Sequence, residues 1–223
     1  MRLYLRLAIT TLVVSGALTA LVSTASARNL SVSAQAFRIS WTSLEWTIGG
    51  VRVLCPTTLE GSFHTATFGK TAGALLGYVT RSIIRRPCTG GTMWFHSGET
   101  NEVLGGTFAN TLPWFTAYSG FEGTLPALIR VRFTFPTLLA AARASVFGIP
   151  VLCEYITDNS HGNAIGTANR DTATGVLTTL DMSGTIRNNG GSEFCPDARL
   201  QNAAGDGVIT RLGLTTRITL TLI

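Results

Sequence analysis

Most of the chain consists of short stretches in which hydrophobic and polar residues alternate, separated by turns that are rich in glycine. The last stretch shows the pattern most clearly, because Ile218, Leu220 and Leu222 alternate with polar side chains. A period of two places successive side chains on opposite faces of a strand, so this stretch predicts a strand with one face in the core. About ten such segments predict a mainly β protein, an antiparallel β-sandwich or barrel with at most one or two short helices.

The predicted strands lie between turn segments and span most of the chain after its first 29 residues. They cover 30–40, 40–47, 51–63, 93–96, 112–121, 128–135, 145–156, 176–187, 208–212 and 214–223. Two turns have a specific signature, since Asn189-Gly190 and Asp206-Gly207 suit type I′ hairpins, whose central residues need positive φ. We therefore expect a hairpin at each of these two pairs.

Two segments do not fit the strand pattern cleanly. Over residues 65–81, Phe68, Leu75 and Val79 are among the apolar side chains at helical spacing. Three glycines interrupt this segment, each costing about 1 kcal/mol relative to alanine in a helix, so helix and strand–bend–strand both remain open. The second segment, residues 137–144, is rich in leucine and alanine and predicts one or two helical turns.

The beginning of the chain has the three-part pattern of a cleavable secretory signal peptide. Arg2 and Arg6 give it a positive start, an apolar run follows, and Ala25 and Ala27 form the small-x-small pattern that signal peptidase accepts. We predict cleavage after Ala27, so that the exported chain begins at Arg28.

The alternative interpretation of this segment is an uncleaved membrane anchor. A membrane-spanning helix needs about 20 strongly apolar residues. The run here is diluted by small and polar residues, namely Thr10, Thr11, Ser15, Gly16 and Thr19. We therefore predict a secreted or cell-envelope protein with one domain over residues 28–223 and no integral membrane segment after cleavage.

Charged residues make up only 13% of the chain, which argues against a highly charged partner such as nucleic acid. Two of the 17 basic residues lie in the predicted signal, so 15 basic side chains remain against 12 acidic ones. A nucleic-acid-binding protein usually carries a concentrated basic stripe. The densest basic group here is Arg81, Arg85 and Arg86, which suits a solvated loop before Cys88, so we predict no nucleic-acid partner.

Four cysteines, an even number in a chain with an export signal, predict a disulfide framework. Of the three possible connectivities we favour Cys55–Cys88 with Cys153–Cys195, because these bonds do not cross and keep each half of the chain self-contained. Zinc sites normally use paired cysteines at close spacing, which this sequence lacks, so we predict neither a metal nor a cofactor.

A tripeptide of the first half is repeated in the second half of the chain. Residues 53–55 and 151–153 have the same sequence, and each is followed by a strand-like stretch and a histidine. This repeat could come from an old duplication or from the chance similarity of two strands.

Three stretches of the chain have a distinctive sequence, namely residues 55–64, which read CPTTLEGSFH, residues 73–81, which read GALLGYVTR, and residues 215–219, which read TTRIT. Together they resemble a group of small secreted β-rich proteins from high-GC actinobacteria. The resemblance covers most of the exported chain and implies export. That group has no assigned activity, so the resemblance implies no catalytic or binding residue.

The sequence contains none of the common catalytic motifs, since GxSxG, HExxH and the P-loop are all missing. Glu60 and His64 would share a strand face about 13 Å apart, which is too far for direct proton transfer. His96 and Glu99 flank a turn and could form an acid–base pair. In each case a solvated strand face or surface turn is the simpler interpretation.

The most polar stretch of the exported chain runs from Asp158 to Asn163 and includes His161. With Glu154 nearby it could supply oxygen ligands to Ca²⁺, although it does not fit the EF-hand pattern. An exposed loop is the simpler interpretation of this stretch.

The four tryptophans are either core residues or part of a face that binds sugars or apolar ligands. Trp41 and Trp46 are five residues apart, so a regular strand would place at most one of them in the core. Trp94 and Trp114 are the other two candidates, with Trp94 on the face opposite its neighbouring phenylalanine.

We expect a non-enzymatic exported β domain with a binding or structural role in the cell envelope or outside the cell. One alternative is an extracellular hydrolase of unfamiliar type, with Glu60, Glu122 or Glu154 acting beside a histidine. The other is a carrier that holds a small apolar ligand inside a barrel.

N-terminal sequencing of the exported protein tests the signal. We expect the sequence to begin at Arg28, because the small residues at 25 and 27 direct cleavage to that bond. Recovery of the chain from membranes with Met1 intact would show an anchor instead.

Overall fold

The computed structural model describes residues 29–96, 100–101, 106–107, 110–124, 127–157, 164–202 and 207–223. Within these ranges the chain forms 17 strands and no helix, so the prediction of a mainly β fold is confirmed. No helix that could cross a membrane occurs in these ranges. Ala25, Ala27 and Arg28 lie outside the described residues, and the signal peptide stays a prediction.

The strands, in chain order, are β1 (Asn29–Val32), β2 (Ala36–Ile48), β3 (Val51–Phe63), β4 (Thr67–Gly69), β5 (Leu75–Ile84), β6 (Gly91–Phe95), β7 (Thr100–Asn101), β8 (Gly106–Thr107), β9 (Trp114–Thr124), β10 (Ala127–Phe135), β11 (Leu139–Val146), β12 (Ile149–Ile156), β13 (Ala164–Arg170), β14 (Leu177–Gly191), β15 (Ala198–Asn202), β16 (Gly207–Arg211) and β17 (Leu220–Leu222). The pairings between them are antiparallel.

The main sheet closes on itself in a ring. Its strand order runs β13–β10–β9–β5–β3–β2, continues through β15 and β16 to β14, and returns because β14 also pairs with β13. A sheet that closes in this way has no free edge along the ring. This part of the fold is therefore a barrel, one of the two architectures that the sequence predicts.

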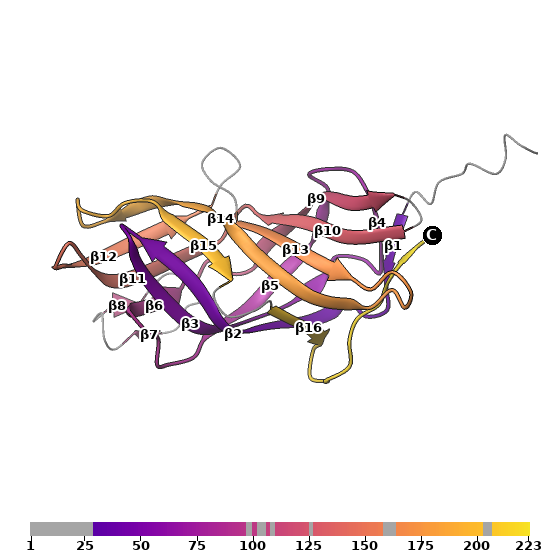
Figure 1. Ribbon diagram of the computed structural model, residues 1–223, viewed down its shortest axis with the longest axis horizontal. Coiled ribbons are helices and arrows are strands. Elements are labelled where there is room, and N and C mark those ends of the chain that lie inside the picture. Colours follow the sequence, from indigo (N-terminus) through magenta and orange to yellow (C-terminus); the bar gives the residue numbers. More distant parts are fainter. Residues whose placement is uncertain are drawn as a thin grey trace, which may run out of the picture.

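A second ring extends the barrel at one end. It runs from β14 through β12 and β11 to β6, and Thr89, two residues before β6, forms a bridge to Leu54 of β3. The ring then returns to β14 through β2 and β15. The long strands β2, β3 and β14 run through both rings, which gives the molecule its elongated shape (Figure 1).

The ends of the barrel are different. At one end lie β6, β11 and β12, and at the other end lie β1, β4 and the C-terminus (Figure 1). The three short strands β17, β1 and β4 form a sheet of their own. We call this sheet the cap. The burial predicted for the C-terminal stretch is confirmed at Ile218 and Leu220, but only Leu220–Leu222 of the predicted strand 214–223 forms a strand, and Leu222 is partly buried.

The predicted disulfide pairing is confirmed, since Cys55 is bonded to Cys88 and Cys153 to Cys195. Both bonds lie in the second ring. Cys88 is next to Thr89, whose backbone exchanges two hydrogen bonds of 2.9 Å with Leu54. The first disulfide therefore fixes β3 to the start of β6 at the point where a single bridge closes the ring.

Trp41 and Trp46 are both in the core, with 2% and 0% of their surfaces exposed, so the prediction that at most one is buried is wrong. The reason is a shift in the pairing of β2 with β3 between Trp41 and Leu44. Two residues of β2 oppose one of β3 there, as in a β-bulge, and the extra residue turns both indoles to the same side.

The two segments for which the sequence allows helices are strands instead. Residues 65–81 form β4 and most of β5, joined by a turn in which Gly73 has a φ of 82°. Residues 139–146 form β11, because this strand pairs with β6 on one side and β12 on the other. Buried alanines such as Ala140 and Ala142 occupy little space between these neighbours, and this packing overrides their helix propensity.

Two turns also differ from the sequence prediction. Asn189-Gly190 is not a hairpin but part of β14, where Asn189 is the extra residue of a bulge opposite β12. The stretch 145–156 is not one strand, because it turns at Phe147-Gly148 between β11 and β12. The turn predicted at Asp206 lies outside the described residues.

Removal of the first disulfide tests the closure of the second ring. In the chain-entropy relation, loops of 33 and 42 residues each give about 4 kcal/mol, so Cys55→Ala/Cys88→Ala and Cys153→Ala/Cys195→Ala should lose similar amounts of unfolding free energy. Only the first double variant should also show fast amide exchange at Leu54, Thr89 and β6, because it frees the single bridge. Equal exchange in β6 for both variants would contradict this role.

Candidate functional site

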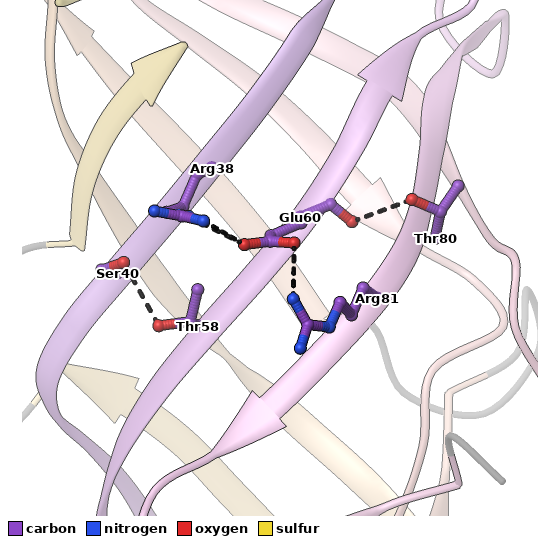
Figure 2. A network of polar contacts seen from close by, with 6 residues as sticks. All are labelled: Arg38, Ser40, Thr58, Glu60, Thr80 and Arg81. Carbon is purple, nitrogen blue, oxygen red and sulfur yellow. Dashed lines mark hydrogen bonds and ion pairs between the residues drawn. The ribbon is translucent and has the colours of Figure 1, made fainter. Parts of the chain in front are cut away.

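Polar side chains gather on the outer face of β2, β3 and β5. Cross-strand pairing places Glu60 of β3 between Arg38 of β2 and Arg81 of β5. Ser40 and Thr58 form the next outward pair along β2 and β3, and their hydroxyl oxygens are 3.2 Å apart (Figure 2). The strand period produces this face, since the neighbouring side chains on β2 point into the core.

Glu60 is the centre of this network, and both of its carboxylate oxygens accept from arginine. Oε1 lies 2.8 Å from Arg38 Nε and 2.7 Å from Arg38 Nη2, while Oε2 lies 3.3 Å from Arg81 Nη1. Only 8% of the Glu60 side chain is exposed, against 41% and 62% for the two arginines. The expectation of a solvated glutamate is therefore wrong, because the arginines cover its carboxylate (Figure 2).

A hollow of about 420 Å³ adjoins this network and shares two residues with it, Ser40 and Thr58. Its wall also includes Thr42, Pro56 and Arg85. Arg85 follows directly after β5, is exposed, and is held there by a 2.9 Å hydrogen bond from its backbone N–H to the carbonyl of Pro56. The wall therefore combines hydroxyl side chains, the apolar residues Trp41, Pro56 and Val208, and the exposed Arg85.

A second buried carboxylate, Glu45 on β2, belongs to a different network. It accepts hydrogen bonds from Arg52, from Thr47 at 3.1 Å and from Gln201 at 2.8 Å. The bond from Arg52 is the main reason that the pKa of Glu45 lies below its ordinary value, and burial opposes this shift. These contacts join β2, β3 and β15, so we assign Glu45 a structural role.

A third carboxylate, Glu122 on β9, resembles Glu60 in its partners but not in its surroundings. Its oxygens lie 3.2 Å from Arg130 Nη1 and 3.7 Å from Arg132 Nε, both on β10. The glutamate side chain is 42% exposed, and both arginines are similarly exposed. This cluster is therefore a solvated surface group, whereas the carboxylate of the Glu60 network is buried.

The histidine predictions have different outcomes. His64 is exposed, as predicted, and packs against Tyr78 with ring centroids 6.0 Å apart. The carboxylate of Glu60, its candidate partner, is instead bound by arginines. His96 is not on the surface, because only 6% of it is exposed. Burial lowers the pKa of His96 from its ordinary value, and the charge of Glu154 acts in the opposite direction.

The structure places two sequence candidates, Trp94 and Glu154, on one face of the sheet, with the buried His96 at the same end. Trp94 of β6 pairs across the sheet with Ala141 of β11, which pairs with Glu154 of β12, and His96 follows β6 at the same end. The guanidinium of Arg86 lies 5.8 Å from the ring of Trp94.

The remaining candidates are either buried or outside the described residues. Trp114 is fully buried and donates a 2.9 Å hydrogen bond from its indole to Thr111. Glu99, Asp158 and His161 lie outside the described residues, so the acid–base pair at the turn and the calcium loop stay predictions.

The hollow is not predictable from the sequence, although Glu60 and the group that contains Arg81 and Arg85 are recognisable there. Arg38 and Ser40 are about 20 residues from Glu60 and Thr58 in sequence and reach them only through the register of β2 against β3. Comparison with family models, curated proteins and solved structures found no match. The resemblance to actinobacterial secreted proteins therefore stays a prediction, and the site is interpreted from its own geometry.

The pH dependence of stability tests the ion pair of Glu45. Because folding lowers its pKa below the ordinary value of 4.5, the stabilisation is present above that pH and is lost as pH falls through the folded value. Glu45→Gln should reduce the free energy of unfolding by about 1–2 kcal/mol at pH 7, and the difference should shrink at pH 3. Urea unfolding at both pH values measures this, and a difference that does not change with pH would contradict the assignment.

Proposed function

We propose that the protein is a non-enzymatic extracytoplasmic binding domain and that the hollow beside the Glu60 network binds an anionic carbohydrate. The two disulfides fit an extracytoplasmic protein, because such bonds persist in oxidising compartments. The observation that carries the proposal is a hollow that has Arg85 in its wall and adjoins, through Ser40 and Thr58, a glutamate bound by two further arginines.

The charge of the site favours an anion. Arg85 lines the hollow, and Arg38 and Arg81 beside it share one carboxylate, that of Glu60, so positive charge is in excess over this group of residues. Each guanidinium has five N–H donors, so the contacts with Glu60 leave donors for a ligand. Arginine binds carboxylate, sulfate and phosphate oxygens through paired hydrogen bonds, and these groups are the negative charges that carbohydrates carry.

The remaining wall of the hollow favours a carbohydrate over other anions. The hydroxyls of Ser40, Thr42 and Thr58 both donate and accept hydrogen bonds, as sugar hydroxyls do. Pro56 offers apolar C–H surface against which the C–H face of a sugar can pack. The site lies on paired strands whose register is fixed by the barrel, so a ligand meets a preformed surface.

The contacts of Glu60 argue against the hydrolase alternative. A catalytic carboxylate must exchange a proton with substrate or attack it directly. Both oxygens of Glu60 instead accept hydrogen bonds from arginines. Its position suits the orientation of two guanidinium groups rather than acid–base chemistry.

A charge reversal at Arg85 tests the proposed site. Dextran sulfate is the probe, because it combines sugar rings with anionic groups. Arg85→Glu should weaken its binding about ten-fold, since attraction becomes repulsion at the wall of the hollow. The matched control is Arg132→Glu, which makes the same charge change at the exposed Glu122 cluster and should weaken binding less than about two-fold. Titration calorimetry at constant ionic strength measures both.

Two further probes separate the parts of the proposal. Neutral dextran should bind far more weakly than dextran sulfate if anion recognition dominates. Poly-glutamate should also bind weakly, because it has charges but no sugar rings. Equal binding of poly-glutamate would contradict a carbohydrate ligand, and equal loss in the Arg85 and Arg132 variants would contradict the hollow as the site.

A further inference from the structure

The half of the barrel next to the cap contains an interior cavity of about 40 Å³. Its wall includes inward side chains from three barrel strands, namely Ile39 of β2, Leu76 of β5 and Leu180 of β14. Of the described residues that line it, only Thr116 has a polar side chain. The cavity is therefore an apolar space inside the same barrel that carries the polar hollow on its outside.

The other half of the barrel also has a buried interior, with large side chains that are fully buried, among them Trp46, Met93 and Tyr155. Interiors are normally close-packed, so unfilled apolar space forfeits dispersion contacts. The cavity near the cap is such a space.

Water does not suit this cavity. A buried water molecule usually makes about three hydrogen bonds, and cavities lined only by aliphatic and aromatic groups stay dry. Thr116 alone offers a hydroxyl, and its neighbours on the wall are phenylalanine, leucine, isoleucine, valine and alanine side chains. An apolar molecule would instead gain contacts on all sides without losing hydrogen bonds.

A row of aromatic rings separates the cavity from the end of the barrel. Phe37 and Phe63 have ring centroids 5.2 Å apart, and Phe63 stacks on Phe68 at 6.0 Å with an interplanar angle of 10°. Phe68 lies on β4, a strand of three residues that pairs with β1 in the cap and with no barrel strand that the structure describes. Short strands with few hydrogen bonds open at lower cost than the long strands of a closed barrel.

We propose that this cavity is a binding site for a small apolar molecule, such as a short alkyl or aryl group, which enters where Phe68 closes the barrel. The space takes a xenon atom or the last few carbons of an alkyl chain, and a larger group requires Phe68 to move outward. The site is independent of the proposed carbohydrate hollow, because Phe37 and Ile39 face into the barrel while Arg38 and Ser40 face out.

Xenon is the first probe, followed by NMR spectra of methyl groups in the intact exported protein. We expect saturable shifts at the methyls of Leu76, Leu180 and Ile209, which line the cavity, and none at Ile186, which is buried outside its wall. Shifts that spread equally over both sets, or that never saturate, would overturn the proposal. This measurement needs no variant, so it does not depend on the tolerance of the core to substitution.

Two substitutions then locate the site. Ala168→Leu adds an aliphatic group to the cavity wall and should abolish the xenon shifts. Its control, Ala127→Leu, makes the same change at an exposed position on β10 and should leave the shifts unchanged.

Phe68→Ala tests the entrance. This change should enlarge it, so benzene at about five times its Kd should raise Tm by about 2–4 °C in this variant. Persistent xenon shifts in Ala168→Leu would place the ligand elsewhere, and an unchanged Tm in Phe68→Ala would exclude entry at the cap.

Discussion

The closure of the strands into rings is the constraint on which the rest of the structure depends. Each barrel strand has its partners fixed on both sides, and this sets which side chains face in and which face out. The first ring closes through the ladder between β13 and β14, while the second closes through one bridge between Leu54 and Thr89. The Cys55–Cys88 disulfide beside that bridge reinforces the weaker closure, and this explains its place in a fold already rich in backbone hydrogen bonds.

The polar site on the outer face is a consequence of this register. Glu60 meets Arg38 and Arg81 because three neighbouring strands place outward residues at the same level, and the paired hydroxyls of Ser40 and Thr58 follow one step along. The comparison with Glu122 shows what is particular here, since a similar set of one glutamate and two arginines is open to solvent there. At Glu60 the carboxylate is buried and its contacts hold two guanidinium groups that are themselves partly exposed.

The sequence predicts the fold class and the disulfides because both depend on local features, namely a period of two and the order of four cysteines. It fails where a neighbouring strand decides the outcome. The bulge in β2 that buries both Trp41 and Trp46 exists only through its pairing with β3, and the alanine-rich β11 is a strand because β6 and β12 enclose it. The site was only partly predictable for the same reason, since Arg38 joins Glu60 across the sheet and not along the chain.

The most direct test of the central claim is to map ligand contacts by NMR with a short sulfated dextran oligosaccharide. Binding in the hollow predicts shifts of the guanidinium Nε–H signals of Arg38, Arg81 and Arg85, together with the backbone amides of Ser40 and Thr58. The signals of the arginines beside Glu122 should stay in place. Shifts of equal size at both arginine clusters, or none at the hollow, would contradict the account of this protein as a carbohydrate-binding barrel.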